Sequence, residues 1–343
     1  MMKNNCFELD SLKTIDNELG TILDHNRSKL KDLLLLEDKT YENFVLPFQL
    51  LNENLDVFIT PVFHLDSVNN CELTQEAYSK CLPLLSAYHS EISQNEELFN
   101  AFKSIDTSSL TIEQKQVIQN EIRDFKLGGC GLEEEKKKRL TELSLRLSEL
   151  SQKFSQNLLD ATNSFEMICD SFEDVKELPQ SDRDIASFKE DGVTKWKFTL
   201  QMPSYLAYIT YGTNRDKREE IYKAYCTRAP ENESVIDEIL QLKDEKVKLL
   251  GFENYAQYSL STKMASSEDD VISFLEDLAK YGKQKANDEL DEVKELALES
   301  DSIVDFNSFD MAYYSEKLKQ IQYSVDEEEY RPYLEKKSVL KGF

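Results

Sequence analysis

The sequence is poor in the residues that interrupt helices. Its 343 residues include only 9 Gly and 7 Pro, whereas a fold of many short strands needs such residues at its turns. This shortage predicts long helices and argues against a strand-rich fold. The chain is long enough for two domains, or for one large helical body with a sizeable core.

Long apolar runs and basic charge are also scarce. No run approaches the roughly 20 apolar residues that cross a bilayer, and no apolar stretch follows the first residues as in a secretory signal. We therefore expect a cytoplasmic protein without a membrane partner. The sequence has 41 Lys and Arg but 66 Asp and Glu, which gives a net charge of −25. Because phosphate binding needs a basic face, nucleic acid is not an expected partner, whereas cationic peptides are compatible.

The motifs of several catalytic classes are missing. A zinc peptidase motif of the HExxH type needs two imidazoles four residues apart, and none of His25, His64 and His89 has such a neighbour. We assign all three to capping, packing or solvent. The six cysteines, at positions 6, 71, 81, 130, 169 and 226, contain no CxxC pair and are expected to be reduced. Without a GxSxG elbow either, the sequence predicts no catalytic and no metal-ligating residue in this chain.

Helical periodicity is the main positive signal. Apolar residues recur at three- and four-residue steps over residues 7–36, after the capping residue Thr40, over 82–89 and over 112–125. Pro61 is expected to break the second of these segments. The clearest seam predicts core packing rather than a partner-binding coiled coil; it consists of Leu140, Leu143, Leu147, Leu150, Phe154 and Leu158.

Only one stretch reads as β structure. The turn residues Asp191 and Gly192 precede an alternation of polar and apolar residues over 195–200, which predicts a small hairpin. The glycine cluster at 128–131 lacks the Lys and Ser or Thr of a phosphate-binding loop, so we interpret it as a turn between helices.

A Tyr- and Arg-rich region follows the predicted hairpin. Its side chains could line a peptide channel through hydrogen bonds and carboxylate contacts. The alternative is packing together with salt bridges to the surplus acids. The candidate substrate-binding residues are Tyr205, Tyr208, Arg215, Arg218 and Arg228, and they lie among Tyr211, Tyr222 and Tyr225.

Several phrases of the sequence resemble one family. Residues 40–43 (TYEN), 61–68 (PVFHLDSV), 202–229 (MPSYLAYITYGTNRDKREEIYKAYCTRA) and 260–265 (LSTKMA) are similar, in this order, to the thimet oligopeptidase and oligopeptidase A family of zinc metallopeptidases. Residues 310–314 (DMAYY) resemble its WDxxYY phrase, with Phe309 where Trp is usual. The resemblance extends from about residue 40 to residue 343.

This resemblance implies a mainly α, neurolysin-like fold in which two helical domains enclose a channel, and a monomer that cleaves short peptides with one zinc ion. In the family, the HExxH helix, the third zinc ligand and the oxyanion-stabilising residues lie beyond the WDxxYY phrase, so none can be assigned here. We expect an amino-terminal helical domain (1–165), a connecting region with the hairpin (166–205) and the leading helices of an incomplete catalytic domain (206–343).

Two functional hypotheses follow. The first is the amino-terminal part of a zinc-dependent oligopeptidase, which lacks the HExxH region and is therefore inactive and metal-free when alone. The alternative is a non-catalytic peptide-binding or helical scaffold protein.

Overall fold

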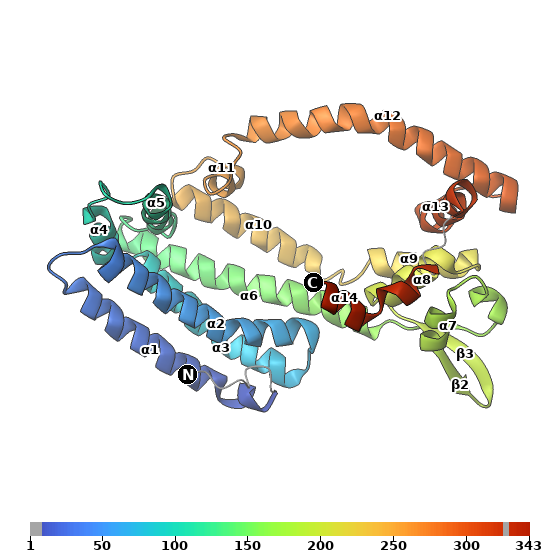
Figure 1. Ribbon diagram of the computed structural model, residues 1–343, viewed down its shortest axis with the longest axis horizontal. Helices are drawn as coiled ribbons and strands as arrows, with labels where there is room; N and C mark the ends of the chain where they lie inside the picture. The colour runs from blue at the N-terminus through green and yellow to red at the C-terminus, as the bar shows by residue number, and fades with distance from the viewer. Residues whose placement is uncertain (1–8, 325–328) are drawn as a thin grey trace. The chain divides into compact units, whose positions relative to one another are not determined.

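The computed structural model describes residues 9–324 and 329–343. It confirms a mainly α fold with one small sheet (Figure 1). The contacts divide the chain into two compact units. Unit 1 comprises Met1–Gln152 and Asp237–Ser259, and unit 2 comprises Lys153–Ile236 and Leu260–Phe343.

Unit 1 is built from helices alone within the described residues. Its elements are η1 (Leu9–Thr14), α1 (Ile15–Leu34), η2 (Tyr41–Val45), α2 (Leu46–Val68), α3 (Glu72–Ser93), α4 (Glu96–Ser104), α5 (Ile112–Leu127), the first part of α6 (Glu134–Ser164), the end of α10 (Asn232–Leu249) and most of α11 (Tyr255–Leu260). These bounds confirm the helical segments predicted before residue 36, after Thr40, around 82–89 and over 112–125.

Two apolar clusters hold unit 1 together. In the first, α1, α2 and α3 pack side by side (Figure 1) and bury aliphatic side chains such as Leu19, Leu23 and Leu55. In the second, Phe102 lies in the middle of several aromatic rings, with its centroid 5.1 Å from that of Phe48. The periodic apolar residues of the sequence therefore form the core, as expected.

The expectation that Pro61 breaks its helix is wrong. α2 continues through Pro61 to Val68, and Ile59, Val62 and Leu65 are buried around the proline. A proline inside a helix costs about 3 kcal/mol, whereas each fully buried large aliphatic side chain contributes about 1.5–3 kcal/mol. Burial of the three neighbours therefore outweighs the lost backbone hydrogen bond.

The glycine cluster and the leucine seam agree with their predictions. Residues 128–131 form the turn between α5 and α6, where Gly129 (φ +92°) and Gly131 (φ +89°) adopt left-handed conformations that suit glycine. Along α6, Leu140, Leu143 and Leu150 are buried. The other seam residues, Leu147, Phe154 and Leu158, are partly buried.

Unit 2 combines helices with the small sheet. Besides the end of α6 and the start of α10 it contains β1 (Met167–Cys169), η3 (Phe172–Val175), α7 (Gln180–Ala186), β2 (Ser187–Glu190), β3 (Val193–Phe198), α8 (Met202–Tyr211), α9 (Arg215–Cys226), α12 (Glu268–Asp301), α13 (Ser308–Tyr323), η5 (Arg331–Leu334) and α14 (Lys336–Gly342).

The sheet confirms the predicted hairpin and adds a strand. β2 and β3 pair antiparallel around Asp191 (φ +49°) and Gly192 (φ +81°). β1 pairs with the other edge of β3, so that Cys169 lies opposite Trp196 and the strand order is β1-β3-β2. A strand of three residues is too short to show an alternating pattern, which is why the sequence did not reveal β1.

Candidate functional site

The Tyr- and Arg-rich region lies where α8, α9 and α13 contact one another in unit 2. Asn214 caps α9 by accepting hydrogen bonds from the amides of Asp216 and Lys217. Capping starts the helix at Arg215, so Arg215 and Arg218, three residues apart, occupy the same helix face.

A single aspartate on α13 joins these two arginines. Arg215 donates to the Asp310 carboxylate through Nε (3.0 Å) and Nη2 (2.8 Å), and Arg218 donates through Nη2 at 3.2 Å. Asp310 and Arg218 are almost completely buried, with exposed side-chain fractions of 0% and 1%. The pair therefore needs this geometry, because either charge alone in the core would be strongly unfavourable.

The hydrogen bonds decide the charge state of Asp310. Burial disfavours its ionised form, but the donors Arg215, the Asn307 amide and Arg218 outweigh burial and lower the pKa of Asp310. The carboxylate stays ionised, and at the start of α13 it also closes a capping box with Asn307.

Two tyrosines extend this network. The Arg218 guanidinium lies 4.0 Å from the ring centroid of Tyr313, a cation–π contact. Tyr313 donates its hydroxyl proton to Glu177 at 2.8 Å, and Tyr314 donates to Asp301 at 2.9 Å. Burial, followed by these acceptors, raises the pKa of both tyrosines, so both hydroxyls remain protonated donors near neutral pH.

A cavity of about 820 Å³ borders the network. Its lining comes from the segment before α7 and the start of α7, the end of α8, one face of α13 and Pro332 of η5. Glu177, Tyr313 and Lys317 meet at this wall, where Lys317 Nζ lies 3.5 Å from the Glu177 carboxylate. Gln180 and Gln320 add amide groups. This mixture of donors and acceptors suits a peptide backbone.

The predicted substrate-binding residues fall into three groups. Arg215 and Arg218 share Asp310. Tyr205 stacks on Tyr225 with 4.1 Å between ring centroids, and Arg228 covers the same ring at 3.6 Å. Tyr208 is fully buried, and its ring centroid lies 4.6 Å from that of Phe198.

These contacts are those of the packing and salt-bridge alternative. Tyr205 is 8% exposed and Arg228 also donates to Thr162 at 3.1 Å. Burial is the main reason why the pKa of Tyr205 rises to about 12. A direct substrate contact by the five residues stays a prediction.

Two partners were missed by sequence reasoning. Asp310 belongs to the stretch that resembles the family, but its sequence suggested no role for it. The signal available was Asn307 three residues earlier, since this spacing is a capping pattern that marks a helix start. Glu177 lies 136 residues from the Tyr313 hydroxyl that it accepts from, and no local signal predicts such a pair.

Comparison with known proteins places both units in one family. Residues 19–137 match the family model "Neurolysin/Thimet oligopeptidase, N-terminal domain", and residues 208–343 match "Peptidase family M3". Oligopeptidase A of Haemophilus influenzae is 40% identical over 331 residues, which cover 92% of this chain and 49% of that protein. This chain belongs to the thimet oligopeptidase and oligopeptidase A family.

More distant relatives agree with this assignment. Oligopeptidase A of Escherichia coli is 38% identical over 320 residues, covering 88% of this chain and 47% of that protein. The organellar oligopeptidase A of Arabidopsis thaliana is 32% identical over 348 residues, which cover 94% of this chain and 43% of that protein. The chain therefore spans about half the length of the relatives it matches. Arg215, Arg218, Asp310 and Tyr313 all lie in the part that matches the peptidase family M3 model.

The residues present do not fit the zinc site that the family resemblance implies. His25 lies on α1, His64 on α2 and His89 on α3. Across 9–324 and 329–343, no group of three or more His, Cys, Asp or Glu side chains could hold a metal ion, whereas a zinc site needs three or four such ligands. In the same residues no helix is long and apolar enough to span a membrane.

Proposed function

We propose that this chain is the amino-terminal part of a zinc-dependent, oligopeptidase A-type enzyme that hydrolyses peptide bonds in short peptides. The observation that carries the proposal is the 40% identity to an oligopeptidase A over 92% of the chain. In this proposal, the zinc ligands belong to a part of the protein outside these 343 residues. The chain alone is then inactive and binds no zinc, and the complete protein is a cytoplasmic monomer.

The contribution of this part is to shape and line the path of the peptide. The cavity of unit 2 offers the Glu177 carboxylate, the Lys317 ammonium and two amide side chains at one wall. Such groups bind the amide groups and termini of a short peptide, while the buried arginine and aspartate network keeps α9 and α13 in register behind them.

A chimera tests this proposal. Residues 1–343 are joined to the remaining, non-matching portion of H. influenzae oligopeptidase A, and cleavage of an internally quenched short peptide is measured. We expect chelator-sensitive cleavage by the chimera and none by residues 1–343 alone, whose zinc content by mass spectrometry should be well below one ion per chain. Chelator-sensitive turnover by the pure 343-residue chain would contradict the proposal.

The second candidate is a non-catalytic peptide-binding or scaffold protein. It is favoured by the cavity of unit 2, where Glu177, Lys317 and Gln320 offer polar groups to a peptide. Under this hypothesis the isolated chain binds short peptides in calorimetry, whereas the folded chimera stays inactive.

A further inference from the structure

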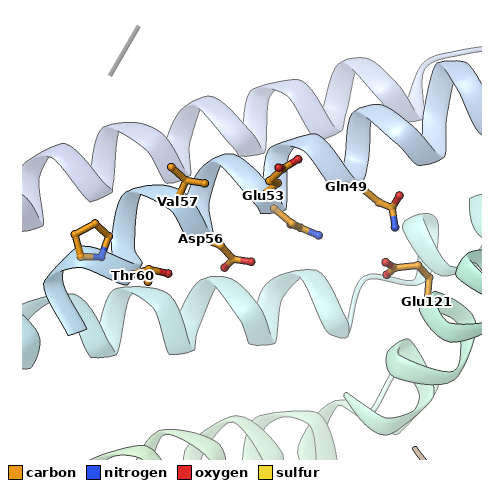
Figure 2. A pocket seen from close by; sticks show the side chains of 8 residues that line it. Gln49, Glu53, Asp56, Val57, Thr60 and Glu121 are labelled. Atoms are coloured by element: carbon orange, nitrogen blue, oxygen red, sulfur yellow. The ribbon is translucent and has the colours of Figure 1, made fainter. Parts of the chain in front are cut away.

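Unit 1 contains a second cavity system, far in sequence from the network of unit 2. A cavity of about 630 Å³ and one of about 320 Å³ lie among α2, α3 and α5, and both are lined by Asn52, Asp56 and Glu121. Figure 2 shows the Glu121 carboxylate directed toward α2, from which Gln49 and Asp56 reach into the same space. We call the two adjoining cavities the unit 1 cleft.

The cleft has an apolar floor and a polar rim. Phe48, Leu55 and Phe125 line the smaller cavity, and Val57 and Pro61 line the larger one. The amide side chains of the rim belong to Gln49 and Asn52. An apolar surface with a few convergent polar groups is the usual composition of a ligand pocket, and the volume of the larger cavity is sufficient for a long side chain.

The charges of the rim have one sign and lack counter-ions. Glu53, Asp56 and Glu121 line the cleft, and within 9–324 and 329–343 none of them forms an ion pair with a Lys, Arg or His side chain. Asp124, which lines the smaller cavity, is paired with Arg123 at 2.9 Å. Glu53 and Asp56 are exposed, whereas Glu121 is partly buried, so Glu121 is the carboxylate that gains most from a cationic partner.

Glu121 shows the cost of this arrangement. Burial, followed by the charge of Asp124, raises the pKa of Glu121 from 4.5 to about 7. His89, on α3, is the one basic group of the lining, and burial lowers its pKa while Asp56 opposes that shift. At pH 8 the cleft therefore carries ionised carboxylates beside a neutral imidazole.

The donor set decides between a metal ion and an organic cation. The described residues contain no group of His, Cys, Asp or Glu that could hold a metal. A guanidinium needs no such convergence, because its planar donors bind two carboxylates at separate positions while its aliphatic stem packs on apolar residues. The apolar floor beside Asp56 and Glu121 matches that shape.

We propose that the unit 1 cleft binds the arginine side chain of a short peptide, with Asp56 and Glu121 as partners of the guanidinium. The proposal rests on the proposed function only in that the ligand is a peptide; binding in the cleft does not depend on hydrolysis. It adds to that function a preference for cationic peptides, at a site separate from the cavity of unit 2.

Calorimetry with a matched pair of peptides tests this assignment. The probes are acetyl-Ala-Ala-Arg-Ala-Ala-amide and the same peptide with citrulline, which keeps the shape of arginine but not its charge. At pH 8 we expect the arginine peptide to bind at least about tenfold more tightly, a difference of about 1.4 kcal/mol. Equal affinities would overturn the proposal.

Variants locate the binding. Glu121→Gln and Asp56→Asn should each weaken binding of the arginine peptide at least about fivefold and leave binding of the citrulline peptide unchanged. The matched control is Glu97→Gln, an exposed carboxyl on α4 outside both cavities. If Glu97→Gln lost the same amount of affinity, the effect would come from net charge alone, and the assignment of the site to the cleft would be overturned. Asp56 is exposed, so its variant should fold even where Glu121→Gln perturbs packing.

The pH dependence gives a third readout. Binding should weaken about tenfold from pH 8 to pH 6 as Glu121 takes up a proton, and this loss should be smaller in Glu121→Gln. Protonation of His89 adds to this loss. Among the described residues, the other charged or titratable groups at the cleft are Tyr88, Glu53, Asp56, Asp124 and Arg123. A pH profile that is identical in wild type and Glu121→Gln would contradict the role of Glu121.

Agmatine separates a peptide ligand from a free guanidinium. It should bind at least about tenfold more weakly than the arginine peptide, since it lacks the flanking backbone; equal binding would overturn the peptide assignment. A chimera that cleaves peptides but shows no arginine preference would refute this inference alone and leave the proposed function intact.

Discussion

The two units of this chain organise their interiors differently. The core of unit 1 consists of aliphatic and aromatic side chains, with Phe102 surrounded by other rings. Unit 2 also has an apolar cluster, which includes Val175, Phe198 and Ile221, but beside it an arginine and an aspartate are buried next to Tyr313 and Tyr314. Both units therefore depend on apolar packing, and unit 2 depends in addition on the mutual compensation of buried charges.

This difference determines where each unit is fragile. A buried ion pair adds little net stability, but removal of one partner leaves a charge without compensation and costs about 3–5 kcal/mol. In an apolar core, a conservative change of shape usually costs about 1–2 kcal/mol. Unit 2 should therefore be sensitive to loss of one charge, whereas unit 1 should respond in proportion to lost packing.

The largest effect is expected for Asp310→Asn. The substitution keeps the shape but removes the charge that compensates Arg218, which is 1% exposed, so unit 2 should lose about 3–5 kcal/mol. Trp196, the single tryptophan of the chain, lies buried in unit 2 and reports its unfolding in urea by fluorescence.

Asp305→Asn is the matched control, because Asp305 also pairs with Arg215 but its side chain is 77% exposed. The urea concentration at the midpoint of its unfolding should change little. The pKa of Asp310 is lowered by folding, so its contribution is present above the ordinary value of 3.8 and is lost as pH falls through the lower folded pKa. Equal midpoints for both variants would show that the buried network does not limit the stability of unit 2.

A smaller loss is expected for Phe102→Leu in unit 1. The leucine fills much of the space, but it gives up the ring contacts with Phe44, Phe48 and Phe125, whose centroids lie 5.1–5.6 Å away. We expect a loss of about 1–2 kcal/mol in urea unfolding followed by far-UV circular dichroism.

Leu35→Ala provides the comparison, since Leu35 is 82% exposed and should change the unfolding free energy by no more than about 0.5 kcal/mol. A loss in Phe102→Leu as large as that in Asp310→Asn would remove the proposed contrast between the units.

Most of the fold follows from local signals in the sequence. The low content of Gly and Pro, the leucine seam of α6 and the Asp191–Gly192 turn each act over one or two helical turns, where spacing specifies structure. Pro61 was misleading because its local penalty is offset by burial against α1 and α3, which the sequence of α2 alone does not contain. The expected division near residues 165 and 205 stays a prediction; by its contacts, the end of α10 belongs to unit 1.

The candidate site was less accessible to sequence reasoning. Composition drew attention to Arg215 and Arg218, but their partner Asp310 is more than 90 residues away. The unit 1 cleft was not anticipated either, because Asp56 and Glu121 are single acids among 66 in the sequence. Only tertiary packing separates a carboxylate in a cavity from one on a solvated face.

Glu121→Gln should raise the free energy of unfolding, whereas Asp310→Asn and Phe102→Leu should lower it. Because burial raises the pKa of Glu121 to about 7 from 4.5 when unfolded, the folded state binds more protons between these values. The contribution of Glu121 is therefore complete below pH 4.5 and is lost as pH rises through 7. After allowance for its partial exposure, we expect Glu121→Gln to gain about 1–2 kcal/mol at pH 8.

The same variant should match the wild type near pH 4.5, where Glu121 is protonated in the folded protein. Glu97→Gln should show no such pH-dependent gain. A constant difference at both pH values would mean that Glu121→Gln acts through packing rather than through the desolvated carboxylate.

The last prediction concerns the rate at which the thiols are modified, and it involves no change in stability. Here the two units should behave alike. Burial raises the pKa of Cys81 in unit 1 and of Cys169 in unit 2 to about 11, so the reactive thiolate amounts to about one part in 10³ at pH 8. Cys226 is exposed. Cys71 and Cys130 are partly exposed, and the backbone hydrogen bond from Thr74 lowers the pKa of Cys71. Both are therefore replaced by serine, together with Cys6, which lies outside the described residues.

In the chain with serine at positions 6, 71 and 130, a disulfide reagent at pH 8 should modify Cys226 in the fastest phase, and Cys226→Ser should abolish that phase. Cys81 and Cys169 should react only after urea unfolds the unit that contains them, so their modification follows the two unfolding transitions separately. Reaction of either thiol in native protein at the rate of Cys226 would show that its unit opens frequently. In that case the contrast between an apolar and a charge-compensated interior would describe packing without predicting which unit is more rigid.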